Sequence, residues 1–182
     1  MAASYFLPYW KITLYAPQYP DSLSVQIFLD HLEGDVREID GLNHYIGMRP
    51  LGEAAVVERS LAHWAIIGIC AFLLIYSFIP CARFSWLLIA PAVGFPIGFA
   101  ADSFYWLYEF GNNLDETAPI NIDPFTPPLF GEGEVGQFRT EAFPQVGFYL
   151  AVAAALLAIA AVWWARTRMC TDDNTSPAEE TA

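Results

Sequence analysis

The sequence predicts a membrane protein with three α-helical transmembrane spans, a small outward α+β N-terminal region and a long outward loop. Three apolar segments, 61–80, 86–106 and 146–164, approach the roughly 20 helical residues that cross a bilayer core. The first and third contain no Asp, Glu, Lys or Arg, and the second contains only Asp102. A mean hydropathy of +0.36 agrees with a multi-pass protein.

Five regions follow from this pattern. They are an outward polar region, transmembrane helices 1 and 2, an outward acidic Pro/Gly-rich loop, transmembrane helix 3 and a disordered acidic tail, at 1–60, 61–106, 107–145, 146–168 and 169–182. Basic residues near one end of the spans, Arg83, Arg166 and Arg168, predict that this end is cytoplasmic. We therefore expect a cell inner-membrane protein whose N-terminal region and loop face the periplasm. The alternative is the inverted topology, with the N-terminal region in the cytoplasm.

The outward N-terminal region is predicted to begin with a β-hairpin. Residues 10–16 and 22–30 alternate apolar and polar side chains on either side of a turn with two prolines. Residues 33–48 predict a helix that breaks at Gly41 and is capped by Asp35 with Glu38 three residues later. The start MAASYFLPYW lacks the basic segment and long apolar core of a signal peptide. We expect an upstream anchor helix, and the alternative is an N-terminal region that is translocated without a signal.

The second and third spans differ in composition. The second contains two prolines that predict kinks, and a Gly94–Gly98 pair that permits close helix contact. The third is rich in Ala, which favours tight packing against another helix. Asp102 is the one acid inside a span and is a candidate for a transport role.

The loop 107–145 is longer than most connections between helices that have no function of their own. It combines many acids with prolines, glycines and exposed aromatic residues. Aromatic side chains gain by burial, so we expect the loop to pack over the N-terminal region or over a partner protein.

The histidines and one methionine define a candidate metal site. His44 and Met48 are four residues apart and would share one face of a helix, and imidazole with thioether suits copper. His31 and His63 are candidates for additional ligands. The alternatives are packing for Met48 and an interfacial hydrogen bond for His63. Cys81 and Cys170 are a further, weaker candidate pair for metal or redox chemistry.

Composition also excludes some functions. The chain has 20 acidic and 8 basic residues, a net charge of −12, which disfavours nucleic acid as a partner. The expected partners are the lipid bilayer and a protein of a membrane complex. No nucleotide-binding, hydrolase, zinc-protease or haem-attachment motif is present in the sequence, so we expect no enzymatic activity.

The stretches LPYWKITLYAPQYP, HLEGDVREIDGLNHYIGM and PFTPPLFGEGEVGQF resemble a family of uncharacterised bacterial multi-pass membrane proteins. That family is associated with gene neighbourhoods of copper-dependent respiration of the nitrous oxide reductase type. The resemblance implies an accessory or assembly protein of an envelope redox or copper system, with His44 and Met48 as copper contacts. The alternative hypotheses are a structural subunit of a larger membrane complex and a small transporter component that uses Asp102.

Overall fold

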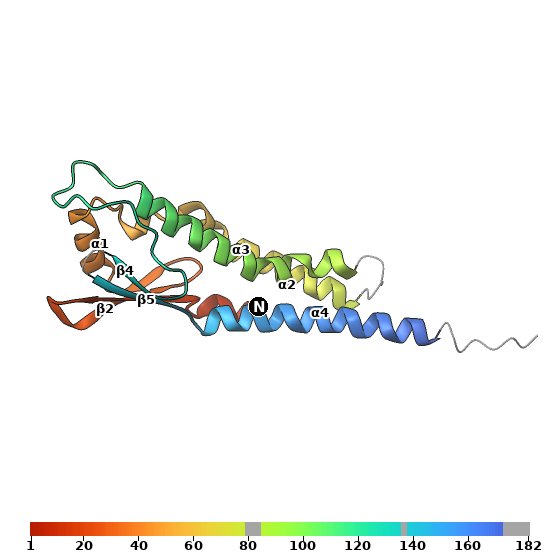
Figure 1. Cartoon of the computed structure of the whole chain (residues 1–182). Coiled ribbons are helices and arrows are strands. Elements are labelled where there is room, and N and C mark those ends of the chain that lie inside the picture. The colour runs from red at the N-terminus through yellow and green to blue at the C-terminus, as the bar shows by residue number, and fades with distance from the viewer. Residues whose placement is uncertain (79–84, 136–137, 173–182) are drawn as a thin grey trace, which may run out of the picture.

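A computed structural model describes residues 1–78, 85–135 and 138–172. The elements in chain order are η1 (Ala2–Phe6), β1 (Trp10–Ala16), β2 (Tyr19–Ile27), β3 (Leu32–Gly34), α1 (Val36–Tyr45), η2 (Leu51–Glu53), α2 (Val56–Phe78), α3 (Ser85–Asn112), β4 (Gly131–Val135), β5 (Phe138–Pro144) and α4 (Val146–Asp172). The strands and α1 lie together at one end of the three long helices (Figure 1). Cys81, Arg83 and the end of the tail lie outside the described residues, as do the side chains of Arg168 and Cys170.

The five strands form one antiparallel sheet in the order β3-β2-β1-β5-β4. The predicted hairpin is confirmed as β1 and β2, with Trp10 opposite Ile27 and Leu14 opposite Leu23. The expectation that the 107–145 loop packs over the N-terminal region is also confirmed, because β5 pairs with β1 along its length. A lone hairpin is marginal in water, and the pairing of β1 with β5 adds a further strand that stabilises it.

The two faces of the sheet differ in chemistry because side chains alternate along each strand. On one face, Leu23 and Val25 are buried against Ile39 of α1. On the other face, the Arg139 guanidinium lies 2.7 Å from the Glu132 carboxylate and 3.2 Å from that of Glu141. The apolar face therefore points toward α1 and the ends of the membrane helices, and the charged face points away from them.

Helix α1 differs from its prediction at its start and at Gly41. It runs without a break through Gly41, and Asp35 makes no side-chain cap. The Asp35 carboxylate instead accepts the backbone N–H of Ser24 at 2.8 Å, which ties the helix start to β2. The expected capping box is therefore wrong, because a tertiary hydrogen bond takes the side chain that would have made it.

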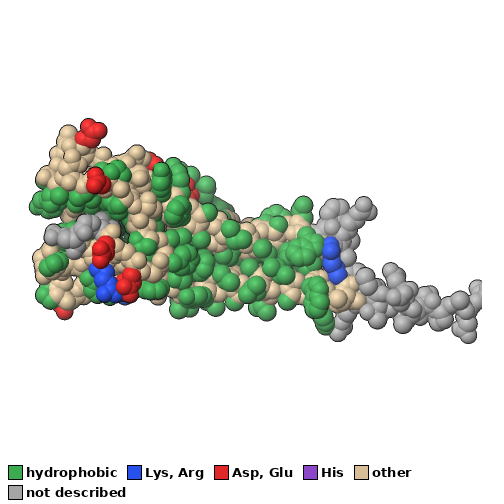
Figure 2. Space-filling model, in the orientation of Figure 1, with side chains coloured by type: hydrophobic (Ala, Val, Ile, Leu, Met, Phe, Trp, Pro, Cys, Tyr) green, Lys and Arg blue, Asp and Glu red, His purple; other side chains and the backbone are tan. Residues whose placement is uncertain are grey.

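The three predicted spans are confirmed as three helices that are long and apolar enough to cross a membrane. Figure 2 shows apolar side chains over the helical part and acidic and basic groups gathered mainly at the sheet end. Helix α2 begins and α3 ends several residues beyond their predicted limits, toward the sheet. Helix α3 continues through Pro91 and Pro96.

Helices α3 and α4 pack closely along a seam of small and β-branched residues. Ala151, Ala155, Ala158 and Val162 lie on one stripe of α4, and Ala151 and Val162 are completely buried. Ile89 of α3 packs into the cluster of Ala158 and Val162. The predicted tight packing of the Ala-rich span is confirmed, and we call this contact the α3–α4 seam.

Among the described residues, the glycine pair of α3 makes no such contact. A Cβ placed on Gly94 or on Gly98 would meet no atom there within 4 Å. The expected packing at these glycines is therefore wrong for the described spans of this chain, and packing against a partner subunit stays a prediction. The small residues that bring helices together lie on α4 instead.

Candidate functional site

His31, one of the four predicted metal ligands, lies at the turn after β2 and is held by two carboxylates. Its Nδ1 lies 2.6 Å from Asp30 and its Nε2 lies 3.2 Å from Glu33. Partial burial lowers the pKa of His31, but the hydrogen bonds and charges of Asp30 and Glu33 outweigh it and hold the pKa above the usual value. A protonated imidazole has no lone pair for a metal, so this arrangement favours an ion-pair role.

His44 and Met48 do not share a helical face, which corrects the spacing argument for a copper site. Helix α1 ends at Tyr45, and Gly47 follows with a left-handed φ of +78°. The Met48 N–H donates to the Asn43 carbonyl at 2.9 Å, in the pattern that terminates helices at a left-handed glycine. His44 remains exposed on the helix, whereas Met48 is half-buried.

His63 lies on the first turns of α2, half-buried, with its ring 4.8 Å from that of Trp64. Over the described ranges, no three His, Cys, Asp or Glu side chains come close enough together to hold a metal ion. The copper site therefore stays a prediction, and His31, His44, Met48 and His63 lie on separate elements or faces.

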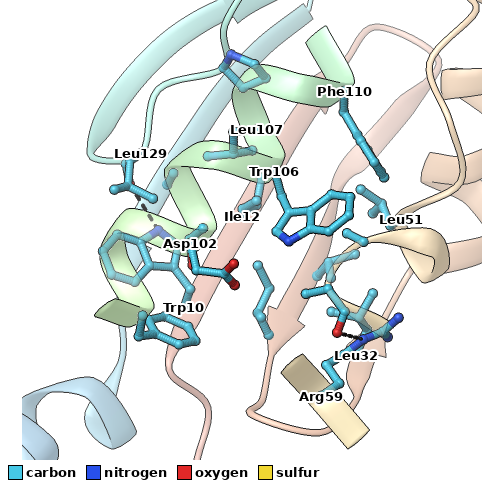
Figure 3. A pocket seen from close by; sticks show the side chains of 18 of the residues that line it. Trp10, Ile12, Leu32, Leu51, Arg59, Asp102, Trp106, Leu107, Phe110 and Leu129 are labelled. Atoms are coloured by element: carbon cyan, nitrogen blue, oxygen red, sulfur yellow. Dashed lines mark hydrogen bonds between the residues drawn. The ribbon is translucent and has the colours of Figure 1, made fainter. Parts of the chain in front are cut away.

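The structure instead presents a cavity of about 530 Å³ between the sheet and the helices. We call it the sheet–helix cavity. Its walls are the apolar face of β1, β2 and β5, the inner side of α1, the start of α2 and the C-terminal half of α3. The loop before β4 covers part of it. Figure 3 shows Trp10 and Ile12 of β1 facing Trp106 and Leu107 of α3 across this space.

The lining of the cavity is largely apolar. Ile12 and Val25 line it from the sheet, whereas Ala65 and Phe95 line it from within the helices that fit a membrane. The cavity therefore extends across the border between the sheet and the bilayer-spanning part. Six lining residues carry an amide, hydroxyl or charged side chain: Asn43, Glu58, Arg59, Asp102, Ser103 and Thr140.

Three of these polar residues carry charge. The Glu58 and Asp102 carboxyl groups line the cavity from α2 and α3. The Arg59 guanidinium donates to the carbonyl oxygens of Gly52 and Ala55 in the segment before α2. Figure 3 shows Asp102 on α3 and Arg59 at the start of α2 on different sides of this space.

Two nitrogen donors at the cavity have no hydrogen-bond partner. Asn43 Nδ2 and Trp106 Nε1 are buried, and neither has an acceptor at bonding geometry in the part of the chain that is described. Asp102, one helical turn before Trp106, is the polar neighbour of the indole but does not meet that geometry. Both residues line the cavity, and Asn43 is only 8% exposed. A buried donor without an acceptor is costly, so these two groups mark the site.

Several hydrogen bonds hold the loop before β4 in place, and two of them involve residues that line the cavity. The Trp10 indole N–H donates to the Leu129 carbonyl at 3.0 Å, and the Phe125 N–H donates to the Gly111 carbonyl at 3.0 Å. Gly111 is buried, and a Cβ there would overlap the Phe125 carbonyl oxygen. The glycine therefore allows the loop to lie directly on the end of α3.

The sequence singled out Asp102 and Met48, which both line the cavity, but missed Asn43 and Trp106. Asn43 occupies the apolar side of α1, one residue after Leu42, where an amide is out of pattern. That mismatch was the available signal for Asn43. Nothing in the sequence distinguishes Trp106 from the other aromatic residues at the end of α3, because its lack of a partner is a tertiary property.

The fold and this site define a three-helix membrane protein that carries a cavity beneath an antiparallel sheet. No family model, curated protein or solved structure matches the chain.

Proposed function

We propose that the protein binds a lipid-like molecule in the sheet–helix cavity, at the border between the bilayer and the sheet. The observation that carries the proposal is the apolar cavity of about 530 Å³ whose lining continues from the membrane helices onto the sheet. Binding pockets for small molecules span roughly 300–1,000 Å³ and are mainly apolar with a few polar groups. The protein would act as a binding or presenting protein anchored in the membrane.

The position of the cavity supports a ligand that comes from the bilayer. Ala65 and Phe95 lie within the segments that fit a membrane, and Ile12 lies at the opposite wall in β1. An acyl or alkyl chain that moved from the bilayer along α2 and α3 would meet apolar side chains throughout. Its burial would contribute about 25 cal/mol per Å² of apolar surface removed from water.

A photo-crosslinking experiment in nanodiscs tests the proposal. The probe is a dialkyl glycerol ether with a diazirine at the end of one chain. Bilayer lipid contacts the outside of the helices in any membrane protein, but it reaches Ile12 and Val25 on the inner face of the sheet only through the cavity. We expect crosslinks in the peptide that contains β1 or β2.

Two glycines on α3 supply a matched pair of variants. Gly98 lines the cavity and Gly94 does not, and a Cβ at either meets no atom within 4 Å. Gly98→Phe should reduce the crosslinks to the sheet at least fivefold because the ring occupies the cavity, and Gly94→Phe should leave them unchanged. No crosslink to the sheet in the wild-type protein would refute the proposal.

The sequence-based hypotheses of a copper-handling accessory protein, a structural subunit and a transporter component remain predictions. The cavity reaches Asp102, as a transporter would require, but its lining is too apolar to favour an ion path.

A further inference from the structure

We infer that the ligand of the sheet–helix cavity is an uncharged lipid that carries a carbonyl oxygen, and that Asn43 and Trp106 recognise this oxygen. The inference rests on the proposed binding function and adds the chemistry of the polar group. Its basis is the pair of buried N–H donors, Asn43 Nδ2 and Trp106 Nε1, that line the cavity and lack acceptors within the described ranges.

The donors specify an acceptor on the ligand. Asn43 is on α1 and Trp106 is on α3, so they approach the cavity from two walls. Most buried polar groups in proteins are hydrogen-bonded, whereas neither of these N–H groups has an acceptor at bonding geometry among the described residues. An acceptor oxygen on an otherwise apolar molecule would satisfy one or both donors without adding a further unpaired group.

The charges around the cavity select against an anionic ligand. Glu58 and Asp102 place two carboxyl groups on the lining, and the one lining cation, Arg59, already donates to the Gly52 and Ala55 carbonyls. A carboxylate or phosphate headgroup would therefore meet more repulsion than attraction. A neutral carbonyl accepts hydrogen bonds without this cost, which is why we assign a carbonyl rather than an acid.

The segments around the two donors are held in place independently of any ligand. The C-terminal turn of α1 is closed by the Met48 N–H on the Asn43 carbonyl at 2.9 Å. The Trp106 ring packs edge-on against Phe110, with ring centroids 5.7 Å apart. Removing either N–H while keeping the side chain's bulk should therefore change recognition more than folding.

The test is competition for the diazirine ether probe, whose crosslink to the sheet reports occupancy. The competitors are dioleoylglycerol, the dioleyl glycerol diether that has the same chains but no carbonyl, and sodium oleate. We expect the ester to compete about tenfold more strongly than the ether, the scale of one hydrogen bond to a buried donor, and oleate to compete least. A long-chain dialkyl ketone distinguishes an ester carbonyl from a ketone carbonyl, and either one outcompeting the ether supports the inference.

Variants assign the effect to the two donors. Trp106→Phe and Asn43→Leu should each lower the ester-to-ether ratio toward one while the ether competes as before. Trp64→Phe is the matched control, because Trp64 is 64% exposed on α2 and does not line the cavity. If one variant fails to fold, the other still decides, because each removes one donor.

The outcomes separate this inference from the proposed function. If the ether probe crosslinks the sheet but ester and ether compete equally, water satisfies the donors; the binding function then stands and the carbonyl assignment is overturned. If the probe does not crosslink the sheet at all, both are overturned. A ratio that persists in both donor variants also overturns the role of Asn43 and Trp106.

Discussion

The α3–α4 seam and the sheet–helix cavity are built from different side chains. Side chains fill the space between the elements in the seam and leave it open in the cavity. In the seam, Val162 of α4 and Ile89 of α3 are completely buried, and Ala158 lies between the two helices. Around the cavity, large apolar side chains of the sheet face α2 and α3 but do not fill the space between the sheet and these helices. Small residues that fit closely mark a structural contact, whereas large apolar residues that enclose space mark a binding site.

Trp10 lines the cavity and packs against the start of α4, and its removal should have the largest effect. It is 1% exposed, packs edge-on against Phe130 and Phe148, and bonds the loop through Leu129. We expect Trp10→Ala to lower the free energy of unfolding by about 3–5 kcal/mol, the usual cost of truncating a buried aromatic residue. Thermal unfolding in detergent, followed by circular dichroism, measures the change.

Trp64→Ala is the control for this prediction. Trp64 is 64% exposed on the membrane surface of α2, so its loss should cost under about 0.5 kcal/mol. Equal losses in the free energy of unfolding for the two variants would show that the packing of Trp10 does not stabilise the fold.

The loop over the cavity should respond to a single methyl group at Gly111. A Cβ there would overlap the Phe125 carbonyl and lie 3.2 Å from Pro127 Cδ. Gly111→Ala should cost about 1–3 kcal/mol through overpacking, and should make the segment 113–130 more sensitive to limited proteolysis.

Gly52→Ala is the matched change, because a Cβ at Gly52 meets nothing within 4 Å. Unaltered proteolysis of Gly111→Ala would indicate that the loop is not held by its contact with the end of α3.

The same substitution on the two sides compares the seam with the cavity directly. Ala158→Leu adds volume where Ala158 is 8% exposed against α3, and should cost about 1–3 kcal/mol. Ala65→Leu adds the same volume toward the cavity, where Ala65 is exposed, and should change stability by less than about 0.5 kcal/mol. Thermal unfolding of both variants in one detergent is the measurement. A larger loss for Ala65→Leu would reverse the assignment of the two regions.

The smallest expected effect is a pH dependence from His31. Because its pKa is raised by Asp30 and Glu33 in the folded protein, its stabilisation is fully present below the unfolded pKa of about 6.5 and is lost as pH rises through the folded value. Exposed ion pairs contribute about 0–1 kcal/mol, so the loss should be small.

His31→Gln should remove this dependence, and unfolding measured at several pH values from about 6 to 8 tests it. The Asp30 carboxyl affects stability at acidic pH instead. Burial raises its pKa, but hydrogen bonds from His31 and Tyr5 outweigh that and lower it, so its contribution is lost only as pH falls through the folded value. An unchanged slope above pH 6 in the variant would show that His31 is not the group involved.

Several elements followed from the sequence because they rest on local pattern. The three spans, the hairpin of β1 and β2, and the helix α1 all reflect periodicity of apolar residues. The capping of α1 failed because Asp35 bonds to β2 instead, which no local pattern reveals.

The candidate site could be predicted only in fragments. Met48 and Asp102 were singled out for other roles, and both line the cavity. Asn43 and Trp106 were missed, because a donor is unsatisfied only in relation to the groups that tertiary packing places around it.

The sequence by itself determined that the chain enters a membrane with three helices and carries a polar region beside them, because hydropathy and alternation act over short distances. Tertiary structure decided that β5 completes the sheet, that α4 rather than the α3 glycines forms the close seam, and that the sheet stands over α2 and α3 with a cavity between them. The pairing of β5 with β1 and the loop over the cavity depend on residues more than 100 positions apart, such as Trp10 and Leu129. The seam depends on how well the side chains of α3 and α4 fit together.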